Sequence, residues 1–471
     1  MSNIRFIRRL ATLGLALGLA LALVATGCGG AGNQTTTMTT SSAKVQIKIG
    51  DAPADSVLAF EVGITRADLV QQGGATVNVL KTPVEIELTH LAGTVGPLAL
   101  ADVPAGTYTG VTVAVSNVEV TYLPPGSTSP VEKTFALNTT VTVPFTSAIT
   151  ISNQPTILNF EFNVAQSLVF DMSGNVTDLK PVFTVSVSTV APNTEQDEES
   201  GHVEDAVGKV SNIKQASGGT AASFDLTPQS GGSPQTFSVD AKTEFGDGLA
   251  QFADLKDGML VEVDAVTQTD GTLRATDVEM MEASNGMEAD GIVIATTGSP
   301  VTSLNMLVQD DTENVAANML GTTLSVDVSN AMFKSPMNDS GFSPLLQGLP
   351  FTPKFDNTTV AVGQRIQVNG ASTGQMQDSF SANEVRLQQQ ALTGTVSPAV
   401  SGSNATFSLL LDADSAFVKL TKASSLNVYQ VSSTKLKDIS SIAQGMKVRV
   451  RGLLLFDGTN YQFVAARITQ P

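Results

Sequence analysis

The chain has 471 residues, of which 42% are hydrophobic, and its 44 acidic and 26 basic residues give a formal net charge of −18. This composition is globular rather than disordered, the length allows about three or four domains, and the negative charge argues against a nucleic-acid partner. A single cysteine excludes an intramolecular disulfide and a cysteine-cluster metal site, and only two histidines are available for imidazole chemistry.

Residues 1–27 are typical of a bacterial export signal, because three arginines precede an apolar run that ends in small residues. At about 16 residues, this run is too short to span a bilayer comfortably. The sequence Val24-Ala25-Thr26-Gly27-Cys28 resembles the lipobox of bacterial lipoproteins, which implies acylation of Cys28 and cleavage before it. Alanine stands where the lipobox prefers leucine, and an ordinary secretory signal is the alternative.

Lipid on Cys28 is the expected membrane anchor, since two or three acyl chains hold a protein stably at a bilayer without a transmembrane helix. Gly29 follows the cysteine, where an inner-membrane retention signal would often place aspartate. By resemblance to enteric sorting rules, this favours the outer membrane, with the periplasmic and the surface-exposed side both open. Residues 28–43 are rich in Gly, Asn, Gln, Thr and Ser, a composition that predicts a flexible tether.

Residues 44–190 predict a β-sandwich domain, because apolar and polar residues alternate in several segments. In residues 111–122 the apolar parity shifts from odd to even positions across Ser116-Asn117, which predicts a bulge or tight turn that keeps both halves on one core. Residues 191–203 are acidic and lack apolar periodicity, so they predict a solvated linker.

Three repeats follow the linker, at residues 204–284, 287–389 and 390–471. Each contains an early and a late marker glycine, spaced by 50, 72 and 51 residues: Gly208 and Gly258, Gly291 and Gly363, Gly394 and Gly445. The longer spacing predicts an insertion at residues 335–353 of the second repeat. Each marker glycine is expected in a turn with positive φ. We expect the repeats to be separate modules that extend outward from the sandwich. Residues 392–471 should therefore fold alone.

These motifs resemble two bacterial families. Ile49-Gly50-Asp51-Ala52-Pro53 and Val103-Pro104-Ala105-Gly106-Thr107-Tyr108 resemble domain of unknown function 4382, whose fold is similar to prealbumin-like and carbohydrate-binding-like sandwiches. The glycine-led strands and the terminal Asp270-Gly271-Thr272-Leu273 resemble domain of unknown function 5666. The second resemblance implies small β-barrels similar to oligonucleotide-binding folds. The predicted fold class is therefore all-β, and neither family supplies an agreed catalytic residue.

Few residues are candidates for chemistry. His90 is expected to be a half-buried strand-end histidine rather than a base, and His202 to be a solvated linker residue. Asp339-Ser340-Gly341 matches the aspartic-protease tripeptide, but that mechanism needs a second carboxylate. Acidic residues are expected at outward, solvated strand positions: Glu85, Glu87, Glu119, Glu262 and Asp264.

Loop carboxylates are the remaining candidates, because hard cations prefer oxygen ligands. Asp310-Asp311-Thr312-Glu313-Asn314 and Asp412-Ala413-Asp414-Ser415 lack the glycine and distal glutamate of an EF-hand, so solvated turns are the favoured interpretation over calcium sites. No catalytic residue, cofactor or metal ligand is predicted. The expected function is that of a non-enzymatic, lipid-anchored envelope protein with a structural or binding role. The expected partners are the membrane and an envelope polysaccharide or protein; an accessory subunit of an envelope enzyme or transporter is the other alternative.

Overall fold

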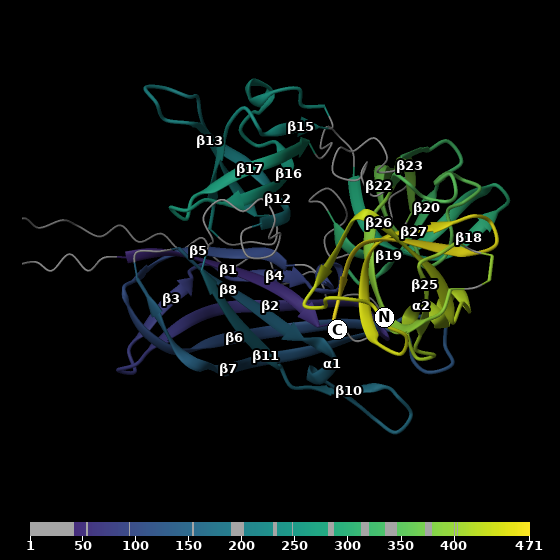
Figure 1. The fold of residues 1–471 in the computed structure, drawn as a ribbon, viewed down its shortest axis with the longest axis horizontal. Helices are drawn as coiled ribbons and strands as arrows, with labels where there is room; N and C mark the ends of the chain where they lie inside the picture. The colour runs from purple at the N-terminus through teal and green to yellow at the C-terminus, as the bar shows by residue number, and fades with distance from the viewer. Residues whose placement is uncertain are drawn as a thin grey trace, which may run out of the picture. The chain divides into compact units, whose positions relative to one another are not determined.

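The computed structural model describes residues 42–52, 55–93, 95–152, 155–189, 202–228, 233–246, 248–280, 287–311, 320–334, 346–372, 379–399, 401–402 and 404–471. The signal segment, Cys28, residues 28–41 of the tether, residues 191–201 of the linker and Asp339-Ser340-Gly341 lie outside this part of the chain, whereas the last two tether residues, 42 and 43, belong to the first strand. Within it the fold is all-β, as predicted, with a sandwich followed by small barrels (Figure 1). No helix among the described residues is both long and apolar enough to span a bilayer.

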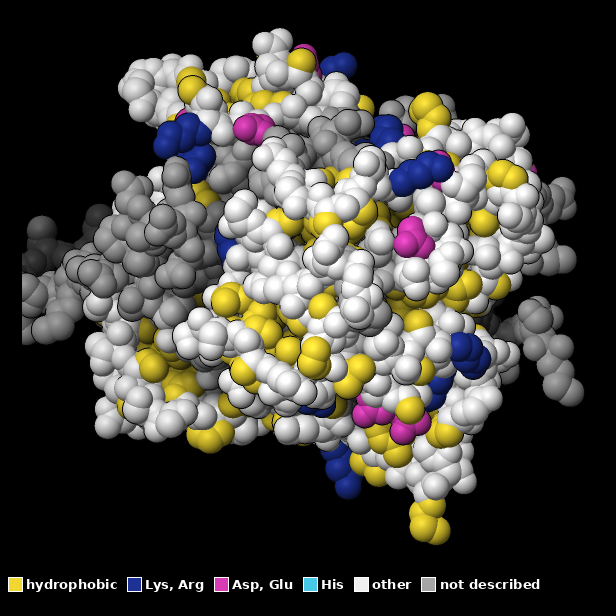
Figure 2. Space-filling model, turned by 45° about the vertical axis from the view of Figure 1, so that its right-hand side comes forward, with side chains coloured by type: hydrophobic (Ala, Val, Ile, Leu, Met, Phe, Trp, Pro, Cys, Tyr) yellow, Lys and Arg dark blue, Asp and Glu magenta, His cyan; other side chains and the backbone are white. Residues whose placement is uncertain are grey.

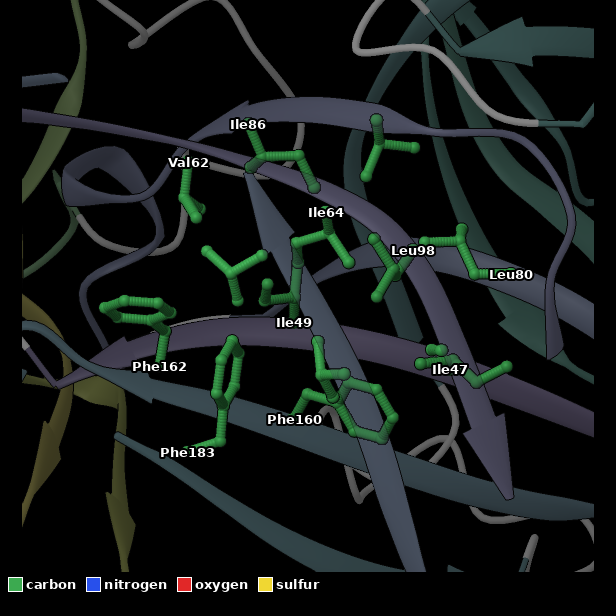
Figure 3. Close-up of a cluster of buried hydrophobic side chains, with 14 of the residues drawn as sticks. Ile47, Ile49, Val62, Ile64, Leu80, Ile86, Leu98, Phe160, Phe162 and Phe183 are labelled. Carbon is green, nitrogen blue, oxygen red and sulfur yellow. The ribbon is translucent and has the colours of Figure 1, made fainter. Parts of the chain in front are cut away.

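The N-terminal sandwich consists of two sheets around one core. One sheet has the strand order β11-β8-β1-β5, and the other has the order β3-β2-β6-β7 with β4 paired to β2. Inward side chains from both sheets meet in the core that Figure 3 shows, and the rings of Phe60 and Phe162 lie 5.1 Å apart between the layers. The strands are β1 (Ser42–Ala52), β2 (Val57–Gln71), β3 (Thr76–Leu80), β4 (Val84–Glu87), β5 (Val95–Pro104), β6 (Gly106–Tyr122), β7 (Val131–Ile151), β8 (Thr156–Asn163) and β11 (Phe183–Thr189).

Shorter elements connect these strands. They are the 3-10 helix η1 (Thr89–Leu91), the helix α1 (Val164–Ser167) and the hairpin of β9 (Leu168–Phe170) and β10 (Val176–Leu179). The predicted change of parity in β6 is confirmed: its register against β7 shifts between Ser116 and Val118. Val115 and Val118 are therefore both buried although their positions differ in parity.

Three barrels with one topology follow the sandwich. Apart from the short strands β15 and β21, each barrel has five strands: the first pairs with the second and fourth, and the third and fifth close the barrel by parallel pairing, β14 with β17, β20 with β23, and β26 with β28. This is the predicted small-barrel fold. The first barrel contains β12 (His202–Lys214), β13 (Ala222–Pro228), β14 (Gln235–Val239), β15 (Glu244–Gly246), η2 (Phe252–Asp254), β16 (Leu260–Thr267) and β17 (Leu273–Met280).

The other two barrels repeat this order. The second contains β18 (Met287–Gly298), β19 (Val301–Asp311), β20 (Thr323–Asp327), β21 (Met332–Lys334), β22 (Arg365–Ser372) and β23 (Ser379–Leu387). The third contains β24 (Gln389–Ser397), β25 (Phe407–Leu411), α2 (Ala416–Thr421), β26 (Ser425–Lys437), β27 (Lys447–Phe456) and β28 (Tyr461–Thr469).

The marker glycines have two different roles, and the prediction of positive φ is right for only one set. The late glycines, Gly258, Gly363 and Gly445, have φ of +88°, +87° and +84°. The early glycines lie inside strands β12, β18 and β24 instead, where the first strand passes close to the second. A Cβ on Gly291 would lie 2.0 Å from the carbonyl oxygen of Leu307, so this position excludes any side chain.

Gly363 has a second constraint that the other late glycines lack. A Cβ there would lie 2.7 Å from Cε2 of Phe417, whereas none of the described atoms lies within 4 Å of a Cβ on Gly258 or Gly445. We expect Gly258→Ala and Gly445→Ala each to cost about 1 kcal/mol for the left-handed backbone. Gly363→Ala should cost about 2 kcal/mol or more because it adds a clash. Urea-unfolding midpoints of the three variants test this, and equal midpoints would contradict it.

The second and third barrels share a hydrophobic core. Leu453, Leu455 and Val464 of the third barrel cluster with the buried residues of the second. From the predicted insertion, Phe351 packs its ring edge-on against Tyr429 of the third barrel, with centroids 4.9 Å apart. The expectation of separate modules is therefore wrong for this pair, because isolating residues 392–471 would expose these apolar side chains to water.

Candidate functional site

A cavity of about 110 Å³ lies where the sandwich meets the second and third barrels. One part of its lining is polar and the other apolar. The polar residues include Asp55 and His90 from the sandwich, Gln309 and Arg365 from the second barrel, and Gln390 and Thr393 from the third. The apolar residues include Val57, Leu58, Ile292, Leu411, Phe417 and Leu420. The cavity is thus the place where three domains bring chemically different side chains together.

The buried Glu87 and the partly buried His90 form a pair beside this cavity. The period-two pattern placed Glu87 on the solvated face of its strand, but its side chain is only 3% exposed. Strand β4 ends at Glu87 and the chain turns into η1, so the alternation that holds for Glu85 no longer applies. Nδ1 of His90 lies 3.0 Å from Oε2 of Glu87. His90 is a partly buried residue with its Nδ1 partnered, as predicted, although it lies in η1 and not at the end of a strand.

Four further hydrogen bonds converge on the Glu87 carboxylate. Oε1 accepts from the Phe60 backbone N–H at 2.8 Å and from both the backbone N–H and the hydroxyl of Thr89, at 3.0 and 2.6 Å. Oε2 also accepts from the backbone N–H of His90 at 3.1 Å. Burial alone would raise the pKa of Glu87, but these bonds and the neighbouring imidazole lower it below the ordinary value of 4.5. Glu87 is therefore ionised at neutral pH and holds the turn at residues 87–90 in place.

Both distal barrels contact this turn. Nε2 of Gln309 donates to the carbonyl oxygen of Leu58 at 2.7 Å and to the hydroxyl of Thr89 at 3.0 Å, which in turn donates to Glu87. From the third barrel, Arg451 Nη1 donates to the carbonyl oxygen of His90 at 3.1 Å. The Glu87 network thus connects the sandwich with the second and the third barrel.

Further cations of the third barrel bind backbone carbonyls of the sandwich. Arg467 Nη1 donates to Gly93 O at 3.0 Å, and Nζ of the buried Lys419 on α2 donates to Leu123 O at 2.9 Å. Desolvation lowers the pKa of Lys419, although Asp414 and Asp412 oppose this effect. Charge-assisted bonds of this kind are stronger than neutral ones. These hydrogen bonds join the third barrel to the sandwich. This contact differs from the expectation that the repeats extend outward from the sandwich.

The remaining charges of the cavity lining are largely balanced. Arg365 Nη2 lies 3.8 Å from Oδ2 of Asp290, and its Nη1 donates to Gln389 O at 3.3 Å. Burial raises the pKa of Asp55 above 3.8, and the nearby Lys447 and Arg449 reduce this shift. Because each charge has a compensating neighbour, the lining favours an uncharged polar ligand over an ion.

The other predicted candidates lie elsewhere or outside the described residues. His202 lies at the start of β12 and pairs with Val266, so it belongs to the first barrel and not to the linker. Asp412 accepts the backbone N–H of Asp414 at 3.0 Å in the turn before α2, whose N-cap is Ser415. The side chains of residues 310–314 are not described. Among the residues that are, no cluster of three or more His, Cys, Asp or Glu side chains could hold a metal ion.

The cavity residues Gln309, Arg365 and Asp55, and Lys419, which donates to the sandwich, were not predicted from the sequence. None belongs to a motif, and each contributes through a contact with a distant part of the chain. Only Lys419 has a recognisable sequence feature nearby: Ser415, a residue type that often caps helices, comes directly before the short helix α2.

Comparison with protein families gives two matches. Residues 42–181 match the model described as domain of unknown function DUF4382, and residues 208–279 match that of DUF5666, also a domain of unknown function. Both predicted resemblances are confirmed over these residues. The second and third barrels lie outside the matched ranges, although they share the strand order of the first. No curated protein matches the chain.

Proposed function

We propose that this chain is a non-enzymatic binding protein of the bacterial cell envelope, held at the outer membrane by lipid on Cys28. The export-signal pattern of residues 1–27 and the single cysteine support the location. The observation that carries the binding role is the cavity at the junction of three domains, because concave sites between domains are where ligands most often bind.

The arrangement around Glu87 supports a non-enzymatic role. A carboxylate paired with a histidine is a combination that many enzymes use for acid–base catalysis. In this chain, however, both oxygens of Glu87 accept hydrogen bonds from backbone N–H groups. A general base must reach a substrate proton in a suitable geometry. Here the pair is engaged in domain assembly, and its conformation is fixed by that task.

An envelope polysaccharide is the ligand class that we favour over a protein partner. The polar side chains of the cavity offer both donors and acceptors, and their charges are compensated locally. On the face drawn in Figure 2, Lys and Arg side chains occur in small separate groups without a continuous basic patch, which supports the absence of a nucleic-acid partner. A cavity of this size accommodates part of a sugar, not a folded protein.

Replacing Cys28 with serine is expected to release the protein from membrane pellets into the soluble envelope fraction, because the acyl chains provide the anchoring energy. Ser41→Ala, in the adjacent tether, is the matched control and should pellet like the wild type. Cell fractionation and the mass of the N-terminal peptide measure the two effects. Pelleting of the Cys28→Ser variant at the wild-type level would show that another segment anchors the chain.

A further inference from the structure

The junction cavity contains two polar side chains with incomplete hydrogen bonding. Gln309 and Arg365 are 5% and 9% exposed, and both line the cavity. Among the described residues, neither Oε1 of Gln309 nor Nε of Arg365 has a hydrogen-bond partner. A buried polar atom without a partner is energetically unfavourable, so such atoms commonly mark the place of a ligand or an ordered water.

These two atoms define the polar part of a ligand. The amide oxygen of Gln309 requires a donor, and the Nε–H of Arg365 requires an acceptor. Leu58, Ile292 and Leu420 line the same cavity and provide contacts for an apolar group. A carboxylate accepts but does not donate, so it would leave Gln309 unsatisfied. An ammonium group donates but would be repelled by the guanidinium of Arg365.

The cavity volume limits how large this group can be. In another protein, a cavity of about 150 Å³ holds one benzene molecule, which has six non-hydrogen atoms. At the same volume per atom, a cavity of about 110 Å³ holds roughly four or five non-hydrogen atoms. A whole sugar ring does not fit, whereas a substituent of a sugar does.

We propose that the cavity binds the acetamido group of an N-acetylated amino sugar in an envelope glycan. This group has four non-hydrogen atoms: its N–H donates to Gln309 Oε1, its carbonyl accepts from Arg365 Nε, and its methyl group contacts the apolar wall. The sugar ring stays at the mouth of the cavity. This inference rests on the proposed function, because it specifies which part of an envelope polysaccharide is recognised.

The test compares two oligosaccharides that differ only in acetylation. Calorimetric titration of the detergent-solubilised full chain with the N-acetylglucosamine trimer should show binding, and the glucosamine trimer should bind at least tenfold more weakly. Ile292→Phe should abolish binding of the acetylated trimer by filling the cavity. Leu410→Phe, at an exposed position of β25 outside the cavity, should bind like the wild type.

Saturation-transfer NMR on the wild-type chain provides a test that needs no variant. The acetyl methyl protons should receive the strongest saturation, because they lie deepest in the protein. Equal affinity for both trimers, or strongest saturation of the ring protons, would overturn the acetamido site. Absence of binding to either trimer by a chain that still fractionates with the membrane would also overturn it, while the anchored location would stand.

Discussion

Glu87→Gln is expected to destabilise the folded chain by about 3 kcal/mol, since it removes a buried charge on which five hydrogen-bond donors converge. Glutamine keeps the volume of the side chain. However, its NH₂ group would face hydrogen-bond donors at a position where the carboxylate of Glu87 presents an acceptor oxygen. Glu85→Gln is the matched control on the same strand, because Glu85 is exposed and should change stability by less than about 0.5 kcal/mol. Urea-unfolding midpoints compare the two, and equal midpoints would contradict the structural role of Glu87.

The stability difference between the wild type and Glu87→Gln is expected to depend on pH. The pKa of Glu87 is lower in the folded chain than its ordinary value of 4.5, so the folded state favours the ionised form. The stabilisation is fully present above the unfolded pKa and is lost as the pH falls through the folded pKa. The stability difference between the wild type and Glu87→Gln should therefore be constant above about pH 5.5 and should shrink below about pH 4.5. A difference that grew on acidification would contradict the lowered pKa.

Gly291→Ala is the second change with a large expected effect, about 3 kcal/mol or more. The new methyl group would lie 2.0 Å from the Leu307 carbonyl oxygen, and this oxygen belongs to a paired backbone that cannot move without opening β18 from β19. Gly73→Ala is the control, since none of the described atoms lies within 4 Å of its added Cβ.

Thermal unfolding followed by circular dichroism measures both glycine variants. The Gly291→Ala variant should unfold well below the wild type, and the Gly73→Ala variant close to it. If the two variants unfolded at the same temperature, the early glycines would not be needed for close approach of the barrel strands.

The strands and their class could be predicted because alternation of apolar and polar residues is a local property of the sequence. The bulge in β6 was predictable for the same reason, because the apolar residues change from odd to even positions between Val115 and Val118. Glu87 was misplaced because β4 ends at this residue and the chain turns into η1, where the period-two alternation no longer applies. The early glycines were misassigned because a close approach between strands and a turn with positive φ both select glycine, and the sequence does not distinguish them.

The candidate site could not be predicted, because its residues come together only through long-range contacts. Arg451 and His90 are 361 positions apart, and Gln309 and Leu58 are 251 positions apart. Neither glutamine nor arginine in a strand of a barrel signals by itself that it contacts another domain. The three-domain junction therefore follows from tertiary packing and not from any motif.

Incubation of the purified full-length chain with isolated peptidoglycan sacculi, followed by analysis of both pellet and supernatant, distinguishes glycan binding from glycan hydrolysis. We predict that the wild-type protein sediments with the sacculi and that neither the wild type nor His90→Ala releases soluble sugar fragments into the supernatant. Release of soluble fragments by the wild type that is lost in His90→Ala, with folding intact, would contradict a non-enzymatic binding protein.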